Sequence, residues 1–176
     1  EFHPTVMAAE GEGAYEHMMR VAEKFKGKFI FAVEGAVPVA HDGKCCVVAE
    51  ADHHEVTMTE VTKVLAANAA AVLAVGTCAA YGGIPAGKGN ETGAMGVSAF
   101  LKKEGIPAPV INIPGCPPHP DWIVGTIGLG LQALATNTLG LLVKQGLDAN
   151  GRPKAFYKNV HMNCPHLSAF EAGHMV

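Results

Sequence analysis

Three polar residues stand at or just after the ends of short apolar runs in this sequence: Glu34, Cys78 and Cys116. Each has a glycine within two residues, which permits a tight turn and lets a bulky inorganic group approach the backbone. Thiolates are the ligands that hold iron–sulfur clusters. A carboxylate beside such a site could relay protons, tune its charge, or cap backbone amides. The residues therefore indicate a candidate metal site with two thiol ligands.

The elements that must position these residues alternate along the chain. Short β-branched and aromatic runs predict buried strands, and apolar residues at helical spacing predict helices between them. The predicted strands cover 28–33, 72–75 and 110–113, and the predicted helices cover 12–26, 53–70, 94–103 and 121–134. Strands separated by helices predict an open parallel sheet, whose ligands bind beyond the carboxyl ends of the strands. Cys78 and Cys116 should therefore meet at one rim.

Cysteine spacing by itself leaves two interpretations of these thiols open. The chain has five cysteines, an odd number with no short CxxC pair, so a disulfide framework is not indicated. Free cysteine is usually a buried structural thiol, and Cys78 and Cys116 are far apart in sequence. Cys45 and Cys46 are adjacent and would point to opposite faces of a strand, so we interpret both as structural or incidental.

Composition excludes some classes of function. The 176 residues carry a net charge of −3 without a basic stripe, so nucleic acid is not expected as a partner. The chain is 49% hydrophobic and 16% charged, which indicates surface that another chain covers. The apolar stretch from Ile123 to Ala135 is too short to cross a bilayer and predicts a buried helix instead, so no transmembrane segment is expected.

Three segments together resemble the small subunit of nickel–iron hydrogenases. They are GTCAAYGG at 76–83, VINIPGCPPHPDW at 110–122 and GRPKAFYKNVHMNC at 151–164, and the EG pair at 34–35 also fits. HDGKCC at 41–46 and NTLGLLVKQG at 137–146 resemble the nickel–iron–selenium branch. The resemblance implies a flavodoxin-like domain with an open parallel sheet and helices on both faces, followed by a mostly irregular cluster-binding domain. The expected boundary divides residues 1–140 from 141–176.

The resemblance also implies ligands for iron–sulfur clusters. Cys78 and Cys116 match two of four cysteines that hold a proximal [4Fe–4S] cluster, and His161 and Cys164 match the first two ligands of a distal one. A neutral histidine ligand would make the distal cluster less negative. The CxxC turn that completes the proximal cluster, and the ligands of a medial cluster, do not occur in this sequence. We therefore expect a fragment, or one stretch, of a longer subunit whose first strand is missing.

An electron-transfer role in a heterodimer follows from the resemblance. A large partner subunit would hold the nickel–iron centre and split hydrogen, so no catalytic residue is expected in this chain. Electrons would leave through the cluster at Cys78 and Cys116 and reach an external carrier, such as a multihaem cytochrome or a ferredoxin, near His161 and Cys164. Family analogy implies a periplasmic location, soluble or membrane-associated. Glu34 would lie near the proximal cluster, as a proton relay or as a cap of nearby amides.

Two alternatives remain at this point. The cluster-bearing small subunit of NADH–quinone oxidoreductase shares the PGCPP segment but lacks the GRPK…HxxC tail. A metal-free flavodoxin-like binding domain is the other alternative, although the glycine-rich stretch at 82–89 lacks the spacing of a phosphate loop.

Two features of the predicted helix 121–134 suggest contact with another surface. Gly125, Gly128 and Gly130 cost helix stability, so we expect another surface to approach closely, and the large subunit is the candidate. The lone Trp122 is either an interface anchor or a core residue.

Overall fold

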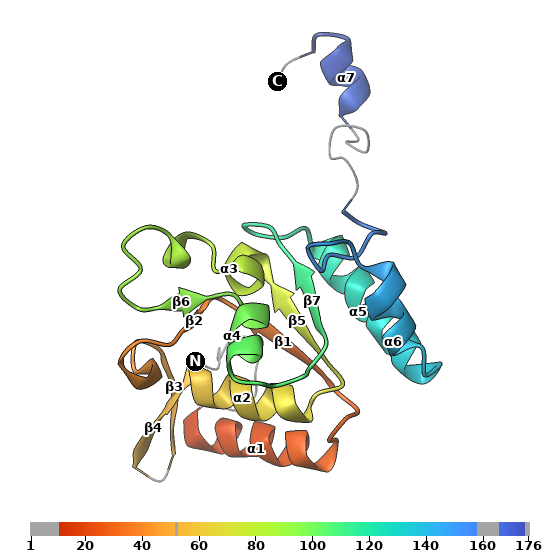
Figure 1. Cartoon of the computed structure of the whole chain (residues 1–176). Coiled ribbons are helices and arrows are strands. Elements are labelled where there is room, and N and C mark those ends of the chain that lie inside the picture. The colour runs from red at the N-terminus through yellow and green to blue at the C-terminus, as the bar shows by residue number, and fades with distance from the viewer. Residues whose placement is uncertain (1–10, 52, 158–165, 175–176) are drawn as a thin grey trace.

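The computed structural model describes residues 11–51, 53–157 and 166–174. Its helices and helical turns are α1 (Gly11–Lys24), η1 (His41–Gly43), α2 (Met58–Asn68), α3 (Gly76–Tyr81), η2 (Ile84–Ala86), α4 (Val97–Lys103), α5 (Pro120–Ala135), α6 (Leu139–Leu141), η3 (Leu142–Gly146) and α7 (Leu167–Glu171). Its strands are β1 (Ile30–Glu34), β2 (Val37–Pro38), β3 (Val47–Ala51), β4 (His54–Thr57), β5 (Ala71–Val75), β6 (Ala94–Met95) and β7 (Val110–Ile113). Figure 1 shows their arrangement.

A parallel sheet with the order β1-β5-β7 forms the centre of the fold. Its register pairs Glu34 with Val75 and Val75 with Ile113, so the three strands end at the same edge. All three strands of this sheet were predicted from the sequence, and the parallel α/β class is confirmed. The edge where they end carries the segments that contain Glu34, Cys78 and Cys116.

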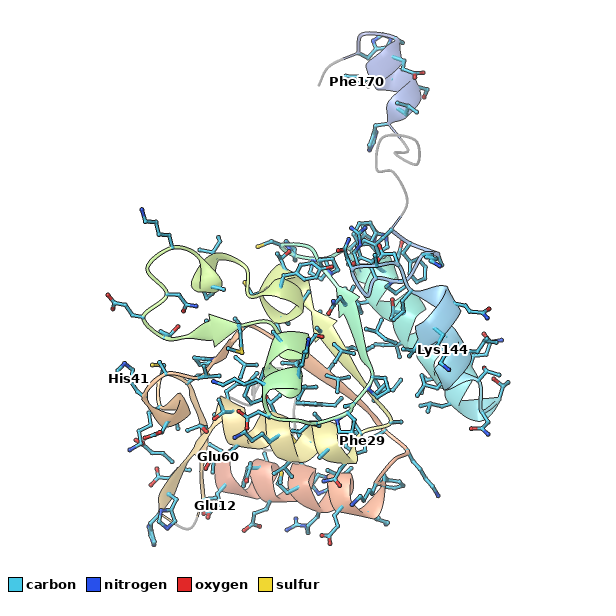
Figure 2. All side chains as sticks on the ribbon, viewed as in Figure 1. Glu12, Phe29, His41, Glu60, Lys144 and Phe170 are labelled. Atoms are coloured by element: carbon cyan, nitrogen blue, oxygen red, sulfur yellow. The ribbon has the colours of Figure 1, made fainter. Side chains whose placement is uncertain are left out.

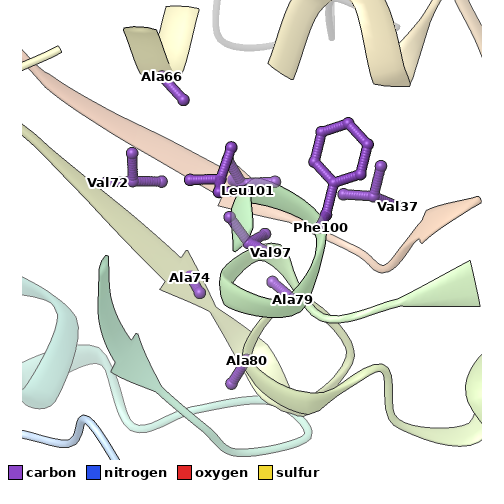
Figure 3. Close-up of a cluster of buried hydrophobic side chains, with 10 residues drawn as sticks. Val37, Ala66, Val72, Ala74, Ala79, Ala80, Val97, Phe100 and Leu101 are labelled. Carbon is purple, nitrogen blue, oxygen red and sulfur yellow. The ribbon is translucent and has the colours of Figure 1, made fainter. Parts of the chain in front are cut away.

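Alternate residues of β5 pack into clusters on opposite faces of the sheet. Val72 and Ala74 contribute to a core with residues of α2, α3 and α4, which Figure 3 shows in close-up. Leu73 and Val75 contribute to a second core with α5 and the segment after it. Helix α1 packs outside α2 (Figure 1). Helices therefore cover both faces of the sheet, as the strand alternation requires.

The region before α2 differs from the prediction. Residues 53–57 do not extend that helix backwards, because β3 and β4 form an antiparallel hairpin that ends at Thr57. Thr57 then caps α2: its hydroxyl accepts from the Glu60 amide, while the Glu60 carboxylate accepts from the Thr57 amide at 2.7 Å. Figure 2 shows Glu60 at this end of the helix. A reciprocal capping box of this kind fixes the first residue of a helix, so the helix begins at Met58.

Two further elements differ from the prediction. The helix expected from residue 94 begins at Val97, because Ala94 and Met95 pair with β2 instead. The short helix α3 was not predicted at all, since six residues are too few to show helical periodicity. This missed helix carries Cys78.

Candidate functional site

Cys78 lies in the short helix α3 that directly follows β5. Ala79 and Ala80 are buried and anchor the helix in the core between the sheet and α4. The Cys78 side chain is half-buried and forms no disulfide. The small apolar residues after the cysteine therefore fix the helix while the thiol stays at the edge of the sheet.

Cys116 lies in the loop that follows β7, and its side chain is exposed. Two hydrogen bonds, one between backbone groups and one to a side-chain hydroxyl, tie this loop to α3. The Thr77 amide donates to the Gly115 carbonyl at 2.9 Å, and the Gly115 amide donates to the Thr77 hydroxyl at 3.1 Å. Each partner directly precedes one of the two cysteines. The structure therefore places Cys78 and Cys116 on joined segments at one edge of the sheet.

The space beside the Cys78 thiol depends on Gly83. The backbone there has φ 54° and ψ −146°, a combination open to glycine and strained for other residues. A Cβ atom added at this position would lie 2.6 Å from the Cys78 sulfur. A missing side chain therefore keeps one side of the thiol free. That free volume, and the thiol chemistry of both cysteines, fit a bound iron–sulfur group with these two residues as part of its ligand set.

Other candidate ligands do not join this pair in the described part of the chain. No group of three or more histidine, cysteine, aspartate or glutamate side chains is arranged to hold a metal among residues 11–51, 53–157 and 166–174. His161 and Cys164 lie outside the described residues. Cys45 and Cys46 lie in the loop before β3, where Cys45 is exposed and Cys46 half-buried.

Glu34 ends β1 at the same edge of the sheet as Cys78. Its backbone pairs with Val75, three residues before that cysteine, and its side chain is exposed. Within the described residues no hydrogen bond joins the Glu34 carboxylate to a backbone amide, which gives no support to the capping interpretation. A role beside a cluster stays a prediction.

Residues 147–157, which we call the return segment, come back to this edge of the sheet after α5 and η3. The amide of Asn112 in β7 donates to the Gly151 carbonyl at 2.8 Å. Asp148 organises the turn, because its carboxylate accepts from the amides of Asn150 and Arg152, both at 2.9 Å, and from Arg152 Nε at 2.7 Å. Burial raises the pKa of Asp148, but these hydrogen bonds outweigh burial, so that the pKa is lowered overall.

Two tyrosine hydroxyls connect the return segment to the cysteine segments. Tyr81, in α3, donates to the Asn150 carbonyl at 3.1 Å. Tyr157 donates to the Pro114 carbonyl at 2.9 Å, two residues before Cys116. The Tyr157 ring packs against Trp122, with ring centroids 4.7 Å apart. Trp122 is half-buried and packs against a core cluster of this chain, which favours the core role, while the role of interface anchor stays a prediction.

Ionisation of Tyr157 is expected at unusually high pH. Burial, followed by the nearby Tyr81, raises the pKa of Tyr157 to about 12, although Arg152 acts in the opposite direction. An ordinary tyrosine ionises near pH 10. Because the folded-state pKa is the higher one, the stabilisation is complete below about pH 10 and is lost as the pH rises through about 12. A difference titration in the ultraviolet between the parent protein and Tyr157→Phe should show one phenol that ionises near the upper value. A difference transition near pH 10 would contradict this expectation.

Sequence reasoning missed the residues that tie the two cysteine segments together. Thr77, Tyr81, Asn112, Asp148 and Tyr157 were not singled out, although four of them lie in or beside the motifs quoted above. The hydrogen bonds of Thr77, Tyr81 and Tyr157 join residues that are distant in sequence, so no local pattern could reveal them. Asp148 is different, because it bonds to Asn150 and Arg152 within its own turn, and an aspartate in such a turn is a recognisable local signal.

Similarity to known proteins identifies the family of this chain. Residues 1–129 match the family described as "NADH ubiquinone oxidoreductase, 20 Kd subunit". The chain belongs to this family. Within it, the resemblance to hydrogenase small subunits is confirmed. The chain is 49% identical over 177 residues to the periplasmic [NiFeSe] hydrogenase small subunit of Desulfomicrobium baculatum, an alignment that covers 97% of this chain and 56% of the relative.

Two further proteins, a hydrogenase small subunit and a solved hydrogenase, are also similar to this chain. The periplasmic [NiFe] hydrogenase small subunit of Solidesulfovibrio fructosivorans is 40% identical, with 98% of this chain and 49% of the relative covered. A solved [NiFeSe] hydrogenase from Desulfovibrio vulgaris Hildenborough superposes with a TM-score of 0.87 at 60% identity, which covers 98% of this chain and 62% of the solved one. This chain thus spans about half the length of the curated relatives it matches. In the described part of the chain, no helix has both the length and the apolar character needed to cross a bilayer.

Proposed function

We propose that this chain is part of the electron-transfer small subunit of a nickel–iron hydrogenase of the selenium-containing branch. The observation that carries the proposal is the pair of thiols, Cys78 and Cys116, on segments joined through Thr77 and Gly115. Its support is the 49% identity to a [NiFeSe] hydrogenase small subunit and the 60% identity to a solved [NiFeSe] hydrogenase. The curated relatives described above are hydrogenase subunits, so the NADH–quinone oxidoreductase alternative is not favoured.

Cys78 and Cys116 would hold a proximal [4Fe–4S] cluster as thiolates, together with ligands from outside this sequence. Such a cluster, when bound, takes up and releases one electron at a time. The residues of this chain would supply position and environment: α3 and the loop after β7 hold the thiols, Gly83 keeps space beside one of them, and half-burial limits water around Cys78. His161 and Cys164 would serve a distal cluster.

A large catalytic subunit would be the partner, and the edge of the sheet offers it a surface. Ile84 follows Cys78 by six residues and is 89% exposed, an unusual position for an isoleucine side chain. Tyr81, in the same segment, is 47% exposed. The partner would hold the nickel–iron centre and perform the bond-breaking step. A periplasmic location is proposed because the relatives described above are named as periplasmic proteins.

Cysteine replacement in the full-length subunit, bound to its large partner and purified without oxygen, tests the proposal. We expect Cys78→Ser and Cys116→Ser each to remove the iron and labile sulfide of one cluster and to abolish hydrogen-dependent dye reduction. Cys45→Ser is the matched control, because Cys45 is an exposed thiol in the loop before β3. If Cys78→Ser and Cys116→Ser both keep the iron content, the spectrum and the activity of Cys45→Ser, the proposal is wrong.

A further inference from the structure

We propose that the return segment is a positioning device for the two cysteine segments, with Tyr81 and Tyr157 as its ties. This inference rests on the proposed function, since it concerns how the ligands Cys78 and Cys116 are held. Neither tyrosine is assigned as a ligand. Both act through the backbone that carries the thiols.

The first tie starts three residues after Cys78. The Tyr81 hydroxyl donates to the Asn150 carbonyl at 3.1 Å, and the Asn112 side-chain amide donates to the same oxygen at 2.8 Å. A carbonyl oxygen accepts two such bonds with its two lone pairs. The end of α3 and strand β7 are therefore held at a single atom of the return segment.

The second tie ends two residues before Cys116. The Tyr157 hydroxyl donates to the Pro114 carbonyl at 2.9 Å. The ring cannot turn freely, because it packs against Trp122 and because the Arg152 guanidinium lies 5.3 Å from its centroid. The packing therefore fixes the direction of the hydroxyl and, through it, the start of the Cys116 loop.

The segment between the ties is stiff enough to transmit position. Asp148 accepts three hydrogen bonds within its own turn, and Asn112 donates to the Gly151 carbonyl at 2.8 Å. A third link runs directly between the cysteine segments, through Thr77 and Gly115. The three links close a ring of contacts that passes through both cysteine segments. Opening the ring at either tyrosine should loosen both ligands.

Removal of single hydroxyls in the full-length complex tests this device. Tyr81→Phe and Tyr157→Phe keep the rings and delete the donors, and Tyr15→Phe in α1 is the matched control because no described residue is hydrogen-bonded to its hydroxyl. Loss of one hydrogen bond of about 1 kcal/mol corresponds to roughly a fivefold change in rate. We expect roughly fivefold faster iron release to a chelator in each variant, and an altered electron paramagnetic resonance spectrum of the reduced cluster.

The double variant and the unfolding curve separate positioning from a merely structural role. Since both ties hold one segment, the effect of Tyr81→Phe with Tyr157→Phe should be smaller than the product of the single effects. Iron release and spectra like those of Tyr15→Phe would overturn the inference, and so would a lowered unfolding midpoint with an unaltered spectrum. If Tyr157→Phe does not fold, the half-exposed Tyr81→Phe decides. Cys116→Ser, made in the otherwise unchanged full-length complex, keeps the two proposals apart. If Cys116→Ser loses its cluster while both tyrosine variants behave like Tyr15→Phe, only the proposed positioning role of the return segment is refuted.

Discussion

Replacement of Gly83 by alanine is expected to displace the Cys78 thiol and to remove most of the iron from the site. The added Cβ would lie 2.6 Å from the Cys78 sulfur and 3.0 Å from its Cα atom, so the side chain and its backbone must both shift. The backbone at Gly83, with φ 54° and ψ −146°, adds strain of about 1–3 kcal/mol for a residue with a Cβ. Relief of the overlap must move the Cys78 ligand itself, and a cost of about 1.4 kcal/mol on cluster binding corresponds to a tenfold weaker binding constant, so we expect at least that loss.

Gly89→Ala is the matched control for this prediction. Gly89 also has a positive φ, of 85°, so alanine there is strained as well, but an added Cβ meets nothing within 4 Å. Iron content, labile sulfide and the spectrum of the reduced cluster would be measured on both variants of the full-length complex, purified without oxygen. Equal occupancy in the two variants would show that the space beside Cys78 is not needed.

Alanine at Gly125 should destabilise the folded subunit by about 1–3 kcal/mol, the usual cost of overpacking a filled site. An added Cβ would overlap the Phe156 ring, 3.0 Å from one Cε and closer to Cζ. Phe156 precedes Tyr157, so its displacement should also disturb the second tie of the return segment. Chemical denaturation of the full-length subunit, followed by circular dichroism, would measure the change in the free energy of unfolding.

Gly128→Ala tests the same helix without the overlap. Nothing lies within 4 Å of a Cβ at Gly128, and alanine should gain up to about 1 kcal/mol of helix stability. The two substitutions should therefore have opposite signs although they lie one helical turn apart. A stabilised Gly125→Ala variant would mean that Phe156 does not pack there in solution.

These glycines also bear on the expectation that another surface, with the large subunit as the candidate, approaches this helix closely. Gly125 is covered by Phe156, and an added Cβ at Gly130 would be 3.0 Å from Ile30 Cδ1 of β1. Two of the three thus serve contacts within this chain, and only Gly128 faces open space. The sequence shows that this helix contains several glycines, but it does not show which neighbouring side chain packs against each of them.

The order of strands and helices was predictable because it depends on local patterns. The runs 28–33, 72–75 and 110–113 are short, apolar and bounded by glycine or proline, and each became a strand of one parallel sheet. The hairpin at 47–57 was missed, since its first strand gave no pattern that was recognised and its second was taken for helix. The capping box at Thr57 was present in the sequence and marks the true start of α2.

The sequence by itself determined the fold class, the placement of Glu34, Cys78 and Cys116 at strand ends, and, through its motifs, the family. These depend on residue type and on short-range spacing. Tertiary structure alone decided which segments hold the cysteines. The contacts of Tyr81 with Asn150 and of Tyr157 with Pro114 join residues 69 and 43 positions apart. The physical reason is that a side-chain hydrogen bond forms where tertiary packing brings a donor to an acceptor. The local sequence around either residue does not indicate which distant residue will be its partner.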